Sequence, residues 1–178
     1  FNLALFYTEN VKNKGGTRMG IKLVRFQQQE TTYWGVLDEQ LFVIEGQFDT
    51  LKDILTNGLD AIKQAKVNGI AVDQNDITLL SPVTDDANIY CQGTNYAAHR
   101  VEAGFTLEKP PYNLLFTKAP STLTSATANI ICPEHVRLLD YEIELGLIMK
   151  QNITEAIEVT NENLKDFVAG FVITNDIS

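Results

Sequence analysis

The stretch 139-LDYEIELGLIM-149 decides how we expect this chain to fold, because apolar and acidic residues alternate along it. Alternate side chains of a β-strand point to opposite faces of the sheet. One face of this strand would be apolar, with Tyr141, Ile143, Leu145 and Leu147. The other face would carry the acidic side chains Asp140, Glu142 and Glu144. The pattern therefore predicts a strand with one apolar face and one acidic face.

The acidic face has two readings. Glu142 and Glu144 would repel each other and would be costly to bury without a partner. A hard divalent cation relieves that cost, because it binds several carboxylate oxygens at once. The alternative is a face open to water, as in many antiparallel sheets. Gly146 and Ile148 share this face and favour burial slightly, but the pattern alone leaves both readings open.

The end of the chain, 171-FVITNDIS-178, reads as a final apolar strand that closes in polar residues. Asp176, taken alone, is most simply a turn residue. Taken with Glu142 and Glu144, it would supply a third oxygen ligand. Three carboxylates with water suit Mg²⁺ or Mn²⁺ better than Zn²⁺, which prefers nitrogen and sulfur.

A second pair of candidate residues is His99 and Glu102, which lie three apart in a segment with helical spacing. Residues at this spacing meet on one helix face, where a carboxylate can orient an imidazole to act as a general base. An isolated pair of this kind is more often a surface histidine in a capped helix. The other histidine, His135, lies in a Pro-Glu-His turn and reads as structural or solvated.

The first part of the chain reads as a small α+β domain, residues 19–83, that ends near Pro82. Alternating residues predict strands over 21–26, 31–37 and 40–46. The segment after Phe48 has helical spacing, a cap at Asp49 or Thr50, and an interruption at Asn57-Gly58.

Residues 84–178 differ in their pattern, with short apolar segments separated by long polar and Pro-containing loops. We expect strands over 88–93 and from 114, and two strand candidates within 129–149. A helix capped by Thr160 or Asn161 should end at Gly170.

Residues 1–18 need not belong to the native protein, because Met19 could be the true start, followed by the regular strand-like segment MGIKLVRF. The codons for Lys14-Gly15-Gly16 can spell a purine-rich ribosome-binding sequence upstream of an ATG at Met19. We therefore expect residues 1–18 to be a non-native or disordered leader, with a true N-terminal arm as the alternative.

Composition narrows the classes of partner. A formal charge of −9 argues against nucleic acid and against an anionic membrane surface, since both require clustered Lys and Arg. No run is long and apolar enough to span a bilayer. The two cysteines, Cys91 and Cys132, lack metal-ligand spacing and fit a reduced, cytoplasmic protein.

Four motifs now occur in a recognisable order, namely CQGTNYAAHRVEAG, LLFTKAPST, LDYEIELGLIM and FVITNDIS. In this order the chain resembles the bacterial branch of the fumarylacetoacetate hydrolase family, over nearly its whole length from about Met19. The resemblance implies a β-rich α+β fold, in which a small N-terminal α+β domain precedes the first part of a mixed β-sandwich roll. It also implies a homodimer at full length, and enzymes of aromatic catabolism are among the members.

The resemblance implies roles for individual residues. Glu142, Glu144 and Asp176 would bind Mg²⁺ or Mn²⁺, with Ca²⁺ as a further option. His99 and Glu102 would form a catalytic dyad on a segment that orders over substrate, and Lys118 would lie near the substrate. The implied reaction is hydrolysis of a carbon–carbon bond in an acylpyruvate or fumarylpyruvate, through an enolate held by the metal. A 2-oxo acid decarboxylase of the oxaloacetate type, or an isomerase or hydratase, is the alternative.

The chain departs from the family pattern at its end. The family's Asn-Asp-x-Ser motif normally continues Ala-Arg-Asp, whereas here the sequence ends at Ser178. We therefore expect a C-terminally truncated chain whose catalytic domain, residues 84–178, is incomplete. An inactive fragment or a metal-binding module without turnover is the alternative from another functional class.

Overall fold

The computed structural model describes residues 5–12 and 18–178, and it describes side chains from residue 20 onward. The chain divides into two compact units. One comprises Phe1–Pro82 together with Thr124–Ser178, and the other comprises Val83–Leu123. Strands predominate over helices, so the α+β, β-rich class expected from the sequence is confirmed.

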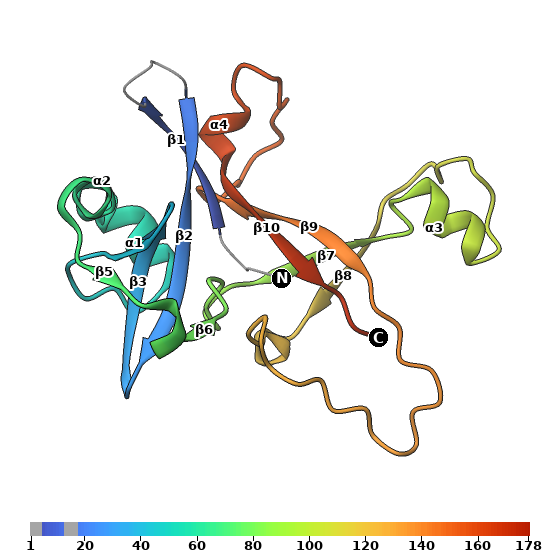
Figure 1. The fold of residues 1–178 in the computed structure, drawn as a ribbon. Coiled ribbons are helices and arrows are strands. Elements are labelled where there is room, and N and C mark those ends of the chain that lie inside the picture. Colours follow the sequence, from blue (N-terminus) through green and yellow to red (C-terminus); the bar gives the residue numbers. More distant parts are fainter. Residues whose placement is uncertain (1–4, 13–17) are drawn as a thin grey trace. The chain divides into compact units, whose positions relative to one another are not determined.

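Eight strands of the described residues form one sheet in the first unit, in the order β5-β4-β3-β2-β1-β10-β9, with β6 paired to β2 (Figure 1). The strand pairings described in this sheet are all antiparallel. The strands are β1 Leu5–Lys12, β2 Arg18–Gln28, β3 Thr31–Leu37, β4 Leu41–Val43, β5 Ala71–Val72, β6 Thr78–Leu80, β9 Ile143–Met149 and β10 Val168–Asn175.

The hairpin of β2 and β3 carries much of the hydrophobic core. Leu23 and Phe26 are fully buried on β2, and Trp34 and Val36 are buried on β3. The Trp34 indole Nε1 donates a hydrogen bond of 2.9 Å to the carbonyl of Phe48, so its polar atom is satisfied at the edge of the core. The strands expected over 21–26 and 31–37 are confirmed, although β2 is longer.

Two helices, α1 Leu51–Asn57 and α2 Leu59–Asn68, lie beside β3 (Figure 1). The Thr50 side chain accepts a hydrogen bond of 3.1 Å from the Asp53 amide, which caps α1. Gly58 both ends α1 and begins α2, so the interruption expected at Asn57-Gly58 is confirmed. Ile54 on α1 and Ile62 on α2 are fully buried, so they mark the face of each helix that packs into the core. A short 3₁₀ turn, Gln74–Asp76, precedes β6.

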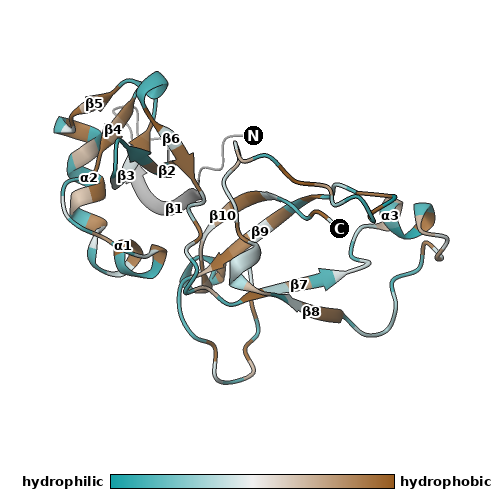
Figure 2. Cartoon of the chain, turned by 90° about the horizontal axis from the view of Figure 1, so that it is seen from below, coloured by the Kyte–Doolittle hydropathy of each residue, from teal (hydrophilic) through white to brown (hydrophobic). Residues whose placement is uncertain are grey.

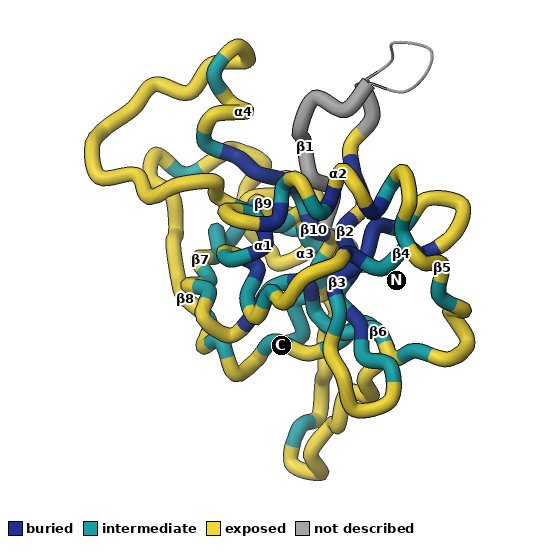
Figure 3. Tube along the Cα trace, turned by 90° about the vertical axis from the view of Figure 1, so that its left-hand side faces the viewer, coloured by how far each residue is buried: buried dark blue, intermediate teal, exposed yellow. Residues whose placement is uncertain are grey.

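The segment before β10 differs from the sequence expectation. The helix α4 covers only Leu164–Phe167, with Asn163 as its N-cap, rather than starting after Thr160 or Asn161 and ending at Gly170. The strand begins at Val168, which is buried and pairs with Met149 of β9. Ala169 is also buried, and the register shifts there before pairing resumes at Gly170. Within 129–149 only β9 forms, so the second strand candidate there is wrong. The loop leading to α4 is exposed, as the yellow tube in Figure 3 shows.

The second unit is a two-stranded sheet of β7 Ile89–Gly93 and β8 Leu114–Lys118. A long excursion between these strands contains the helix α3 Ala97–Glu102 (Figure 1). The side-chain Nε2 of Gln92 donates a hydrogen bond of 3.0 Å to Asn113 Oδ1, which joins the two ends of this connection. A 3₁₀ turn, Pro120–Thr122, follows β8.

The expected leader falls partly outside the described residues. Residues 1–4 and 13–17 are not described, nor are the side chains of 5–12. The backbone of β1 pairs with β2 on one side and with β10 on the other. Whether residues 1–18 pack without core contacts therefore stays a prediction. In the described part of the chain, no helix has the length and apolar character needed to cross a membrane.

Candidate metal centre and catalytic segment

The acidic residues singled out in the sequence lie along the paired strands β9 and β10 or just beyond their ends: Glu144 is on β9, Glu142 comes directly before β9, and Asp176 directly follows β10. Thr174 pairs with Glu144 in the antiparallel register. The same register continues past the strand ends, because the Asp176 amide donates a hydrogen bond of 2.7 Å to the carbonyl of Glu142. Asp140 and Ser178 then exchange two backbone hydrogen bonds, of 2.8 and 3.3 Å. Glu142 therefore lies directly opposite Asp176.

This register puts the three candidate carboxylates on one face. Directly opposite residues of an antiparallel pair share a face, and so do residues two apart on one strand. Along β9 the exposure alternates, with Ile143 57% and Leu145 56% exposed while Glu144 is half-buried. Glu142 and Asp176 are also half-buried. The alternation expected from the sequence is confirmed, and the acidic face is the less exposed one.

The carboxylates share a face, but their side chains do not gather around a common point. Among the described residues, no three His, Cys, Asp or Glu side chains form a group that could hold a metal ion. Cα atoms of a hydrogen-bonded antiparallel pair lie about 5.5 Å apart, within reach of flexible carboxylate side chains. The donor set, three hard oxygen ligands on one surface, fits Mg²⁺, Mn²⁺ or Ca²⁺, provided that the side chains rotate toward one another.

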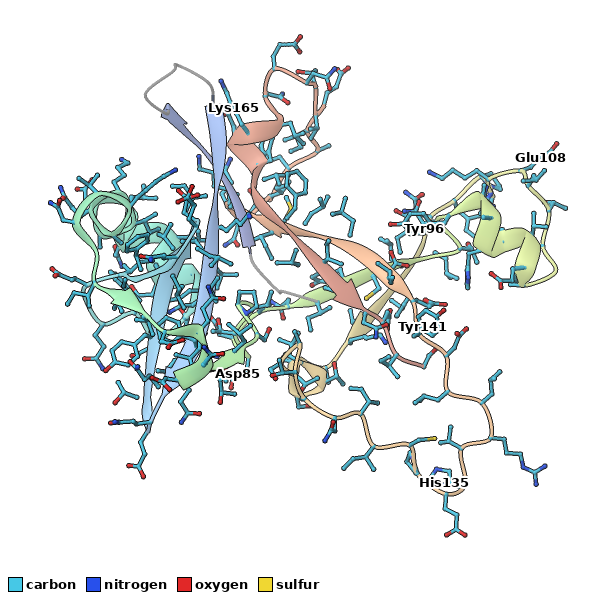
Figure 4. All side chains as sticks on the ribbon, in the orientation of Figure 1. Asp85, Tyr96, Glu108, His135, Tyr141 and Lys165 are labelled. Atoms are coloured by element: carbon cyan, nitrogen blue, oxygen red, sulfur yellow. The ribbon has the colours of Figure 1, made fainter. Side chains whose placement is uncertain are left out.

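The sequence reasoning missed the hydroxyl groups next to these carboxylates. Thr174 lies opposite Glu144, and Ser178 lies opposite Asp140. Only the register reveals this, because the two strands are separated by a loop and a helix along the chain. Figure 4 labels Tyr141 at the point where the chain enters β9.

Gly146 permits close packing beside the acidic residues. It lies opposite Val172, which is 3% exposed. A Cβ atom at Gly146 would come within 2.6 Å of Val172 Cγ2, closer than real side chains allow. A glycine is therefore required at this position by the neighbouring valine, two residues from Glu144.

His99 and Glu102 lie on α3 in the second unit, three residues apart as the sequence suggested. His99 is half-buried and Glu102 is exposed. The helix ends in a Schellman turn, in which the Phe105 amide donates to the Arg100 carbonyl at 2.7 Å and the Gly104 amide donates to the Val101 carbonyl at 3.0 Å. Gly104 has a φ of 80°, the left-handed conformation that such a turn needs.

Arg100, between these two residues, is the functional candidate that the sequence reasoning did not find. It is 6% exposed, although arginine is rarely buried. Its Nη1 donates to the carbonyls of Thr94 and Asn95 at 2.9 and 3.0 Å, and its Nη2 donates to the carbonyl of Leu107 at 2.7 Å. No sequence signal marks this role, since backbone carbonyls leave no trace in composition.

The candidate substrate-binding residue Lys118 and the second histidine, His135, differ in their surroundings. Lys118 is half-buried at the end of β8, paired in register with Ile89. His135 is exposed and lies in the long loop before β9, as Figure 4 shows. The carboxylates thus belong to the first unit, whereas His99, Glu102 and Lys118 belong to the second.

Comparisons with known proteins agree on one family. The family model described as "Fumarylacetoacetate (FAA) hydrolase C-terminal" matches residues 88–178. The chain is 27% identical to the oxaloacetate tautomerase fahd2 of Xenopus laevis mitochondria over 132 residues, which are 72% of this chain and 40% of that protein. It is 32% identical over 123 residues, 69% of this chain, to a 4-hydroxyphenylacetate degradation bifunctional isomerase/decarboxylase from Salmonella dublin, of which it covers 27%.

A solved structure gives the same result for the fold. A fumarylacetoacetate hydrolase from psychrophilic Exiguobacterium antarcticum superimposes with a TM-score of 0.59 at 26% identity. The match covers 89% of this chain and 56% of the other. The chain therefore spans well under two thirds of the length of each of these proteins.

Proposed function

Because this chain belongs to the fumarylacetoacetate hydrolase family, we propose that it serves divalent-metal-dependent chemistry on a small 2-oxo acid. The observation that carries the proposal is the β9–β10 register, which puts Glu142, Glu144 and Asp176 on one half-buried face. The names of the relatives from Xenopus laevis and Salmonella dublin, a tautomerase of oxaloacetate and an isomerase/decarboxylase, support the substrate class.

In this proposal the three carboxylates hold Mg²⁺ or Mn²⁺, with Ca²⁺ as a less demanding substitute. The ion supplies Lewis acidity toward the 2-oxo and carboxylate oxygens of the substrate. The protein residues contribute the arrangement of charge. Three carboxylates on one face repel one another, so the empty face is electrostatically unfavourable and a cation stabilises it. A half-buried position strengthens that effect relative to a fully exposed one.

The proposed base is His99, oriented by Glu102. In the cleavage of an acylpyruvate, His99 would accept a proton from water, and the resulting hydroxide would add to the distal carbonyl carbon. The carbon–carbon bond then breaks, and its electron pair goes to the pyruvate fragment as an enolate. Protonation of that enolate carbon completes the hydrolysis. Lys118, as a half-buried cation, would contribute to holding the anionic substrate.

A second candidate reaction follows from the names of the relatives. Tautomerisation or decarboxylation of an oxaloacetate-like acid passes through an enolate without an attacking water. His99 would then move a proton at the carbon next to the 2-oxo group, or would be dispensable for decarboxylation. Isomerase or hydratase activity belongs to the same set of alternatives.

Further features complete the proposal. We propose a small N-terminal domain over 19–83, an incomplete catalytic domain over 84–178, a homodimer at full length and a cytoplasmic location. The whole protein's activity is part of the proposal too, because the chain covers only 27–40% of the two relatives compared by sequence.

The deciding experiment is a substrate panel followed by NMR. Acylpyruvates and oxaloacetate are incubated with the protein and Mg²⁺ or Mn²⁺, and the products separate cleavage, decarboxylation and tautomerisation. We expect turnover that EDTA abolishes, that Glu144→Gln abolishes and that Glu155→Gln, an exposed loop control, leaves intact. Turnover of none of these acids at saturating metal would refute the proposed function.

A further inference from the structure

The segment 94–107 has no hydrophobic core of its own. Its large apolar side chains face water, with Tyr96 45%, Val101 50%, Phe105 61% and Leu107 68% exposed. Figure 4 labels Tyr96, near the start of this segment, and Glu108, which directly follows it. The helix α3 is only six residues long, far below the length at which an isolated helix is stable in water. Something other than apolar packing must hold it.

Arg100 is the buried side chain of this segment. Its guanidinium contacts the carbonyls of Thr94 and Asn95, which come before α3, and the carbonyl of Leu107, which comes after the Schellman turn. One side chain therefore ties both flanks of the helix together. The three acceptors are backbone atoms, so this clamp depends on the conformation of the segment and not on the identity of its side chains.

The backbone at one acceptor is strained. Thr94 has a φ of 53°, a left-handed conformation that is unfavourable for a β-branched residue. Such conformations persist only where neighbouring groups over-determine them, and they cluster at functional sites. The Thr94 carbonyl accepts one of the Arg100 hydrogen bonds, so the guanidinium contacts the backbone at the strained residue.

The guanidinium is buried at a cost. Its Nε has no hydrogen-bond partner, and its contacts among the described residues are to neutral carbonyls rather than to a carboxylate. Burying a charge costs free energy, and here hydrogen bonds to neutral carbonyls offset that cost without an ionic partner. A planar fork can donate to several carbonyls at once, whereas the compact ammonium group of lysine cannot reproduce that geometry.

We infer that Arg100 is a positioning residue, which fixes the segment 94–107 in one conformation and thereby presents His99 and Glu102 in a preorganised arrangement. The inference rests on the roles proposed above for His99 and Glu102. Arg100 touches neither a substrate nor a metal in this account. It acts through the backbone carbonyls on both sides of α3, and a preorganised base lowers the reorganisation needed during reaction.

The test combines amide hydrogen exchange with steady-state kinetics on Arg100→Met, Arg100→Lys and the exposed control Arg137→Met. In both Arg100 variants, the hydrogen-bonded amides of α3 and of the turn that ends it, namely Arg100 and Ala103 to Phe105, should exchange about tenfold faster or more, while β2 and β3 keep their protection. The kcat should fall about tenfold, with the Mn²⁺ dissociation constant unchanged, because the carboxylates lie on other strands. Arg137→Met should alter neither.

Three results would overturn the inference. The first is unchanged exchange of α3 in Arg100→Met, and the second is an equal loss of protection in β2 and β3, which would indicate a general loss of stability. The third is full protection in Arg100→Lys, which would show that charge suffices without the fork. If the wild-type protein turns over no 2-oxo acid, the proposed function fails, but the exchange data still decide whether Arg100 holds the segment.

Discussion

At the scale of single residues, Asp176 lies directly opposite Glu142 and on the same face as Glu144, so three carboxylates from two distant segments share one surface. The sequence placed Glu142 and Glu144 on one face, since strand alternation requires only that the segment be extended. It could not place Asp176 opposite Glu142, because register depends on hydrogen bonds between strands that are distant in the sequence. The role of Arg100 could not be predicted from the sequence for a similar reason, because its hydrogen-bond partners are backbone carbonyl groups, which every residue possesses.

His99 provides the first prediction at this scale. His99→Ala should lower the turnover of a hydrolysed acylpyruvate by about 10²–10⁴-fold, because a general base is lost. The affinity for Mn²⁺ should stay the same, since His99 is proposed as a base and not as a ligand. The measurement is kcat together with a Mn²⁺ titration of the same variant.

His135→Ala is the matched control, because His135 is exposed in a loop of the first unit. It should leave both quantities unchanged. Weaker Mn²⁺ binding in His99→Ala, with full activity at saturating metal, would make His99 a ligand instead. Unchanged hydrolysis without His99 would favour chemistry that needs no base.

At the scale of elements, the sequence anticipated β9 better than β10. The alternation of 139–149 predicted the strand and both of its faces, because a period of two is a strong local signal. The boundary at Val168 was missed, since the pattern of 160–170 also fits a helix and tertiary pairing decided between the two. Val168 and Ala169 are buried by residues distant in the sequence, and the local pattern of apolar residues does not predict that burial.

Gly146 provides a prediction about this pair of strands. Gly146→Ala should lower the free energy of unfolding by about 1–3 kcal/mol, the usual cost of overpacking. The added Cβ would meet Val172 Cγ2 at 2.6 Å, and the stiff χ1 angle of a buried valine leaves it little freedom to move. Urea denaturation monitored by the Trp34 fluorescence measures the change.

Leu145→Ala serves as the comparison, because Leu145 is on the same strand but 56% exposed on the opposite face. It should change the free energy of unfolding by only about 0.5 kcal/mol. A Gly146→Ala variant as stable as the wild type would show that Val172 yields easily and that the contact does not constrain the strand.

At the scale of the whole molecule, the apolar face of the β9–β10 ladder stays uncovered in this chain. Figure 2 shows the hydrophobic colouring of these two strands. The exposed apolar side chains on this face are Tyr141 71%, Ile143 57%, Leu145 56%, Leu147 52%, Met149 48% and Ile173 45%. Contiguous apolar surface of this kind promotes association of proteins in water.

We therefore expect the 178-residue chain to self-associate with increasing concentration. The double substitution of Leu145→Thr with Leu147→Thr should reduce light scattering, because it removes apolar surface while keeping residues that suit a strand. The control is Val67→Thr, a change at a valine on α2 that is 76% exposed and does not belong to this face. Scattering that is the same in all three proteins would show that this face does not drive association.

We propose as the central point that Glu142, Glu144 and Asp176 bind one divalent cation, which in turn binds a 2-oxo acid. The most direct test is electron paramagnetic resonance of Mn²⁺, titrated into the wild-type chain and into Glu142→Gln, Glu144→Gln, Asp176→Asn and the control Glu158→Gln, with and without oxalate as a 2-oxo acid mimic. Our account predicts one site per chain, tighter with oxalate, weakened at least about tenfold in the three site variants and unchanged in Glu158→Gln. Equal Mn²⁺ binding by all five proteins, or none by the wild type, would contradict it.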